Sequence, residues 1–306
     1  RDLIVTGVQT CALPISSQSF DVWNAGTGPL EFAVIEACDW LRVSPDQGES
    51  NGEHVPIAVS FDTSRLDPGV YSCALVLAAS GVAGGGGLGL SVTIPVTVEV
   101  GVKNVLSLEP VVDNTLYQTT STNLSNGSGP TLLTGEVTTK SWRRGLIGFN
   151  LKGELPANAF ITDAQLDMTL LGAADPAATG TVSLYRVTKA WGEGTSSVDI
   201  PDDIDGTNAA RYDAAWLYAE FNTITWAKQG GDYDSTLTAK RDVQQEGVYT
   251  WGPTDRMLED VQSWYLNSKT NFGWIFLSTE TVSAGWKRFA SSENATIASR
   301  PHLTVT

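Results

Sequence analysis

Short extended runs of apolar residues, separated by turn residues, repeat along almost the whole chain and leave little room for helices. In the first hundred residues the runs recur about every ten residues, and glycine-, proline- or aspartate-rich stretches such as 25–29 and 67–69 separate them. Leu30, Phe32 and Val34 show the alternation that is typical of a strand with one buried face. Residues 16–100 therefore predict a β-sandwich domain.

Residues 101–105 read as a short linker, and the pattern changes after them. About ten strand-like runs and one convincing helix follow in residues 106–306. The helix is expected to begin after Thr254, a typical N-cap residue, and to end at Asn267, with apolar residues at helical spacing between them. This content predicts a jelly-roll β-sandwich with one short helix, so the whole chain is expected to be all-β.

One predicted strand of the second domain, 142–151, has a different pattern of residues on each of its two faces. Ile147 and Phe149 fall on one face at period two, as a strand over a core requires. Gly148 and Asn150 fall on the other face, and their small size leaves room for something to lie across the strand.

The same strand begins with a tryptophan and two cations, and this order recurs once in the chain. Binding a sugar ring takes a flat aromatic side chain and polar groups of fixed geometry, and an acidic sugar adds a carboxylate that arginine or lysine can hold. If the two segments are neighbours, they form a carbohydrate-binding site of Trp142, Arg143, Arg144, Trp286, Lys287 and Arg288. In the alternative interpretation Arg144 pairs with Glu293, Trp286 caps the core, and strand alternation keeps the six from sharing one face.

Carboxylates in the second domain are candidate calcium ligands. Asp232 and Asp234 alternate on a glycine-rich turn, and with Glu193 they offer the hard oxygen ligands that Ca²⁺ prefers. No EF-hand loop follows, so the alternative is an aspartate-rich surface turn. A structural Ca²⁺ is the one cofactor that the sequence suggests.

Composition excludes several classes of function. The formal net charge of −15 argues against a nucleic-acid surface, which needs a basic face, and no apolar run is long enough for a membrane helix. The only histidines are His54 and His302, and neither belongs to an HExxH motif; there is also no Gly-x-Ser-x-Gly. We therefore expect a protein that is not an enzyme, acts as a monomer, and neither binds nucleic acid nor inserts into membrane.

The N-terminal residues resemble no protein module. Residues 5–15 resemble a translated sequencing adapter, so residues 1–15 are expected to be an artefact; a signal-peptide remnant is the alternative. Without Cys11, two cysteines remain, Cys38 and Cys73. They either form a disulfide or are two buried thiols on separate strands.

Two resemblances to known families follow the domain division. Trp23-Asn24-Ala25-Gly26, Trp40-Leu41-Arg42-Val43-Ser44-Pro45 and Leu66-Asp67-Pro68-Gly69-Val70-Tyr71 resemble the BACON-type immunoglobulin-like repeat. The resemblance covers nearly all of residues 16–100. It implies an immunoglobulin-fold module of bacterial extracellular proteins, often a spacer beside polysaccharide-active domains.

Residues 106–306 resemble the DNRLRE-domain family. The family's name motif corresponds to Asp113-Asn114-Thr115-Leu116, after which this chain has Tyr117-Gln118 instead of Arg-Glu. Asn126-Gly127-Ser128 and Trp191-Gly192-Glu193 match better. The resemblance implies a non-catalytic β-sandwich of surface proteins and polysaccharide-active enzymes, similar to carbohydrate-binding modules that include alginate binders.

These observations predict an extracellular or cell-surface bacterial fragment in which the second domain binds a polysaccharide, with acidic polymers among the candidates, and the first is a spacer. Two alternatives stay open. Both domains could be structural stalk or adhesin modules, or the chain could be an accessory part of a polysaccharide lyase or glycoside hydrolase.

Overall fold

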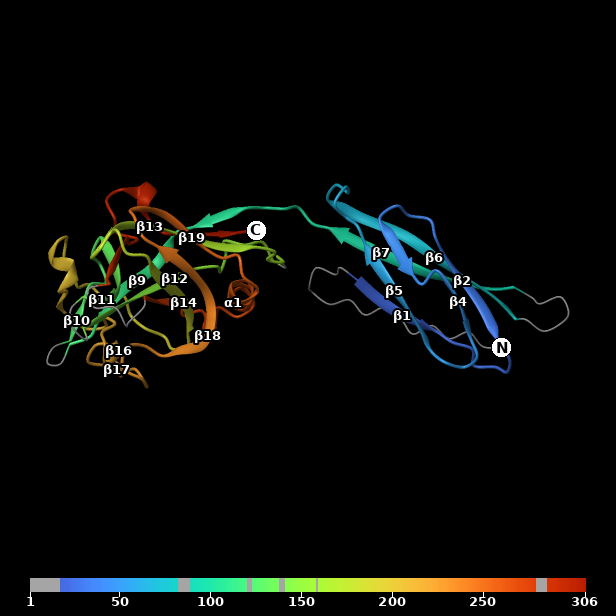
Figure 1. Ribbon diagram of the computed structural model, residues 1–306, viewed down its shortest axis with the longest axis horizontal. Helices are drawn as coiled ribbons and strands as arrows, with labels where there is room; N and C mark the ends of the chain where they lie inside the picture. The colour runs from blue at the N-terminus through green and yellow to red at the C-terminus, as the bar shows by residue number, and fades with distance from the viewer. Residues whose placement is uncertain (1–16, 82–88, 120–122, 138–140, 158, 279–284) are drawn as a thin grey trace. The chain divides into compact units, whose positions relative to one another are not determined.

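The computed structural model describes residues 17–81, 89–119, 123–137, 141–157, 159–278 and 285–306 (Figure 1). Two compact units divide between Lys103 and Asn104, inside the segment predicted as a linker. The prediction for residues 1–15 falls outside the described residues. Both units are built almost wholly of strands, so the all-β prediction is confirmed.

The first unit is a sandwich of two antiparallel sheets. One sheet has the order β1-β5-β3 and the other has the order β4-β2-β6-β7. Inward-facing side chains such as Phe32, Leu41 and Leu77 fill the space between them. The strands are β1 Ser17–Val22, β2 Leu30–Glu36, β3 Leu41–Ser44, β4 Gln47–Ser50, β5 Val55–Phe61, β6 Gly69–Gly81 and β7 Leu90–Val100.

A disulfide joins Cys38 to Cys73 in this unit, with their Cα atoms 6.3 Å apart. Cys38 lies in the segment between β2 and β3, and Cys73 lies within β6. Of the two alternatives that the sequence left open, the structure therefore has the bridged pair.

The second unit contains a large curled sheet and one α-helix in its described residues. Eleven of its strands form this sheet, along the path β18-β14-β20-β12-β11-β21-β13-β22-β8, with β9 on β12 and β19 on β13. The strands are β8 Leu106–Leu108, β9 Pro110–Tyr117, β10 Leu124–Ser125, β11 Thr131–Glu136, β12 Trp142–Phe149, β13 Ala164–Ala173, β14 Gly180–Val187, β15 Thr207–Asn208, β16 Tyr218–Glu220, β17 Ile224–Thr225, β18 Tyr233–Val243, β19 Gly247–Trp251, β20 Trp274–Ser278, β21 Lys287–Ala290 and β22 His302–Val305.

Strand β11 connects the two halves of this sheet. Residues 131–134 pair with β21, and residues 135–136 pair with β12. Side chains of the two halves meet in one core, where Phe276 of β20 packs edge-to-face on Phe289 of β21. A sheet that curls over its own core is a sandwich of the jelly-roll kind, as predicted.

Helix α1, Asp255–Leu266, covers part of this core and confirms the predicted helix. The hydroxyl of Thr254 accepts a hydrogen bond from the backbone N–H of Met257, which is N-capping, and the helix ends before Asn267. Met257, Val261 and Trp264 are buried in the main core. No helix in the described part of the chain has the length and apolar character that crossing a membrane requires.

Strand β12 is buried on both faces along most of its length. Ile147 and Phe149 pack in the main core, as predicted. Leu146, on the other face, packs in a second cluster with Trp216 and Trp226. The chain between β14 and β18 therefore lies over the outer face of the sheet and covers the strand's first half.

Candidate functional site

Five of the six residues predicted as a sugar site lie on β12 and β21, which flank β11, and Trp286 directly precedes β21. Arg143 and Arg288 both turn toward the short 3-10 helix η1, Asp202–Ile204. Arg143 Nε donates to the Ile204 carbonyl at 2.8 Å, and Arg288 donates to both carboxylate oxygens of Asp203 at 2.5 and 2.6 Å. Both guanidinium groups are buried, and burial lowers the pKa of Arg143.

The other two cations point elsewhere. Arg144 Nη1 donates to the carbonyl of Gly230 at 2.8 Å, and its guanidinium lies 4.9 Å from the centroid of the Trp216 ring. Lys287 Nζ donates to the carbonyl of Ala178 at 3.1 Å, and burial lowers its pKa. The four cations therefore serve the interior of the unit and do not share a face.

The two tryptophans are half-buried and do not form an open surface with these cations. Trp142 packs against the second cluster, and the Arg288 guanidinium lies 5.0 Å from the centroid of the Trp286 ring. The structure therefore does not bring Trp142, Arg143, Arg144, Trp286, Lys287 and Arg288 together on one open face. The aromatic–cation stacking that suggested a ligand site serves the core instead.

The three predicted calcium ligands also have separate partners. Asp232 accepts hydrogen bonds from the backbone N–H groups of residues 227 and 228, and Asp234 accepts from Arg256 and Thr236. Glu193 accepts from the backbone N–H of Asp113 at 2.9 Å. Within the described ranges no three Asp, Glu, His or Cys side chains are grouped to hold a metal, so these residues do not make a common site.

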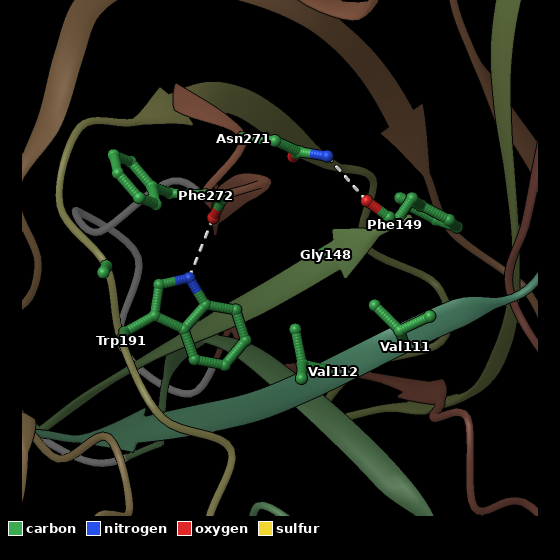
Figure 2. A pocket seen from close by; sticks show the side chains of 8 residues that line it. Val111, Val112, Gly148, Phe149, Trp191, Asn271 and Phe272 are labelled. Carbon is green, nitrogen blue, oxygen red and sulfur yellow. Dashed lines mark hydrogen bonds between the residues drawn. The ribbon is translucent and has the colours of Figure 1, made fainter. Parts of the chain in front are cut away.

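A hollow of about 300 Å³ lies beside the far end of β12 (Figure 2). Gly148 of β12 and Val111 and Val112 of β9 contribute to its lining. Trp191, after β14, contributes its indole, and Phe272, before β20, also belongs to the lining. The volume is at the small end of the range for ligand pockets and suits a single ring.

Two hydrogen bonds fix the groups that line this hollow. Trp191 Nε1 donates to the carbonyl of Phe272 at 2.8 Å, which holds the indole in one orientation (Figure 2). Asn271 Nδ2 donates to the carbonyl of Phe149 at 2.7 Å. Both partner carbonyls belong to residues of the lining, so the aromatic and amide groups are held in place before any ligand arrives.

Gly148 keeps the hollow open. A Cβ atom built at this position would lie 2.8 Å from Val112 Cγ2 and 4.0 Å from Trp191 Cζ2. Any side chain here would therefore enter the space beside the indole. The expectation that small residues leave room on this face of the strand thus holds at Gly148, although the face is covered at Leu146.

Comparisons with known proteins add little to this geometry. No family model matches the chain, and no curated protein matches it. Among solved structures, a crystal structure of tripeptidyl peptidase 2 matches with 12% identity and a TM-score of 0.21, over 94% of this chain and 18% of that one. The chain thus spans under a fifth of that structure, and a score this low carries no argument. The resemblances to the BACON and DNRLRE families stay predictions.

Sequence reasoning placed Trp191 in a family motif but missed it as a site residue, and it missed Asn271 and Phe272. Gly148 was the available signal, because a glycine inside a predicted strand often marks a close approach of a ligand or backbone. The residues that face Gly148 are at least 36 positions away in sequence, so no local pattern connects them.

Proposed function

We propose that the second unit is a non-catalytic polysaccharide-binding module and that one sugar ring of the polymer lies in the hollow beside Trp191. The observation that carries this proposal is the indole itself. It is half-buried, fixed through its N–H, and borders a hollow large enough for a single ring. The apolar face of a sugar ring packs on such a surface, and nearby amide and carbonyl groups can meet its hydroxyls.

The first unit then acts as a spacer in an exported protein of the cell surface or extracellular space. The Cys38–Cys73 disulfide supports this location, because disulfides persist in oxidising compartments. The proposal needs no cofactor and no second copy of the chain. The motif order that resembles the DNRLRE family agrees with it.

Affinity gel electrophoresis with a panel of soluble polysaccharides tests the proposal. The wild-type chain should be retarded by at least one polymer, and Trp191→Ala should lose about tenfold or more in affinity, since loss of an aromatic stacking contact costs roughly 1.5 kcal/mol. Trp191→Phe should keep part of the binding. Tyr212→Ala is the matched control, because it removes an exposed aromatic ring outside the hollow.

Two other outcomes would replace the proposal. Unchanged mobility with every polymer would favour purely structural stalk or adhesin modules. Reducing or ultraviolet-absorbing products from any polymer would show an enzyme.

A further inference from the structure

The described residues that line the hollow beside Trp191 carry no charge. Its lining consists of apolar side chains, Gly148 and the neutral amide of Asn271. Lys189, which lies close to it in sequence, is engaged elsewhere: its Nζ donates to the carbonyl of Thr225 at 2.7 Å and lies 4.0 Å from Asp232. Asp113, next to Val112, is buried and accepts the backbone N–H of Ser292.

A carboxylate or sulfate placed in this hollow would lose water without gaining a cation. Burying an unpaired charge costs several kcal/mol, whereas the C–H face of an uncharged ring loses little on leaving water. The net charge of −15 adds a repulsive field for any polyanion. The four cations that could have paired with such an anionic ligand are buried in the interior of the unit.

We infer that the hollow selects a neutral sugar ring, such as a hexose of an uncharged glucan or mannan, and that Gly148 sets the depth to which the ring enters. This inference rests on the proposed function of the same site. It replaces the expectation of an acidic polymer, which depended on Arg143, Arg144, Lys287 and Arg288.

The backbone at Gly148 does not itself need glycine. The residue lies in strand β12, and its φ is not in the left-handed region that favours glycine. Glycine inside a strand costs roughly 0.5–1 kcal/mol relative to alanine, so its presence here has a stability cost. The missing Cβ lets Val112 pack closely against this position and leaves space beside the indole.

The test compares binding to neutral and acidic polymers. Wild type should bind xyloglucan, laminarin or galactomannan at least tenfold more tightly than polygalacturonate or alginate. Gly148→Val should lose the neutral polymers about tenfold. Because a Cβ here lies 2.8 Å from Val112 Cγ2, Gly148→Ala is measured beside it as the smaller substitution, and the melting temperature of each variant reports whether it folds. Tyr212→Ala should bind as wild type does.

Val111→Lys provides a test by gain of binding. Val111 is 56% exposed at the edge of the hollow, so a lysine there can reach a ligand without entering the core. This variant should gain at least fivefold for polygalacturonate and not for laminarin. Dextran sulfate measures attraction to any polyanion, and an equal gain with it would count against recognition of a sugar in the hollow.

The outcomes separate this inference from the proposed function. Acidic polymers bound by wild type and lost in Trp191→Ala, with neutral polymers not bound, would overturn the neutral class while the hollow remained the site. No binding to any polymer would overturn the proposed function as well. Neutral polymers retained equally by Gly148→Val would show that Gly148 does not set the depth.

Discussion

Arg288 stacks on Trp286 and donates two hydrogen bonds to Asp203, and all of these contacts lie inside the second unit. In sequence, a tryptophan followed by cations is equally compatible with a ligand surface and with an internal ion pair. Which of the two applies depends on the residue that pairs with the cation. For Arg288 that residue is Asp203, which lies 85 positions away in sequence. Residue reasoning could therefore find the aromatic–cation pairs but could not assign their role.

Replacement of Arg288 by alanine should destabilise the unit strongly. It leaves the fully buried Asp203 carboxylate without its cation, and breaking a buried pair in this way costs about 3–5 kcal/mol. Chemical denaturation measures the change in the free energy of unfolding, with the exposed Lys228→Ala as a control expected within about 0.5 kcal/mol. A change below about 1 kcal/mol for Arg288→Ala would contradict the internal role.

Asp113 is the buried carboxyl that should make stability depend on pH. Burial, followed by the charge of Glu293, raises its pKa well above the ordinary value, and its Oδ1 has no hydrogen-bond partner among the described residues. A group whose pKa is raised by folding binds its proton more tightly in the native state. The stability that it contributes is therefore present below its unfolded pKa and is lost as pH rises through its folded pKa.

Asp113→Asn should remove this loss. The variant should be more stable than wild type at pH 7, because it removes the buried charge and its repulsion from Glu293, and the difference should shrink toward pH 4. Thermal melts across this pH range measure it, with the exposed Asp199→Asn as the control. A variant that is less stable than wild type at pH 7 would contradict the account.

At the scale of elements, the period-two runs predicted most strands of both units and the N-cap predicted the helix. Strands β18 and β4 are among those that were missed, and each has a physical reason. Strand β18 lies at one end of the main sheet path and carries polar residues on both faces, so its apolar alternation is lost. Strand β4 contains Gly48 and follows Pro45, which together read as a turn. The hollow could not be predicted, because elements far apart in sequence assemble it.

The disulfide of the first unit should contribute strongly to that unit's stability. It links positions 35 residues apart, for which the chain-entropy model gives about 4 kcal/mol. The double variant Cys38→Ser/Cys73→Ser should lose about that much in denaturant unfolding of the oxidised chain. Under a strong reductant the variant and wild type should unfold alike. Equal stability of the two oxidised proteins would contradict a formed bridge.

At the scale of the whole molecule, the net charge of −15 and the uncharged hollow both weaken the binding of an anionic ligand. A neutral polymer neither gains nor loses from the protein's field, so screening should not matter to it. Its dissociation constant should change by less than about twofold between 20 and 500 mM salt, measured by isothermal titration calorimetry. A steep fall in affinity with salt would indicate a charged contact that the hollow does not contain.

The most direct test of the Trp191 hollow is the response of its indole N–H in a nitrogen–proton correlation spectrum during titration with a neutral xyloglucan oligosaccharide. The chain has ten tryptophans, and the resonance missing from Trp191→Phe identifies Trp191. We predict that this resonance shifts to saturation while those of Trp142 and Trp286 stay in place. Shifts at Trp142 or Trp286 with none at Trp191, or no shift at any indole, would contradict the account.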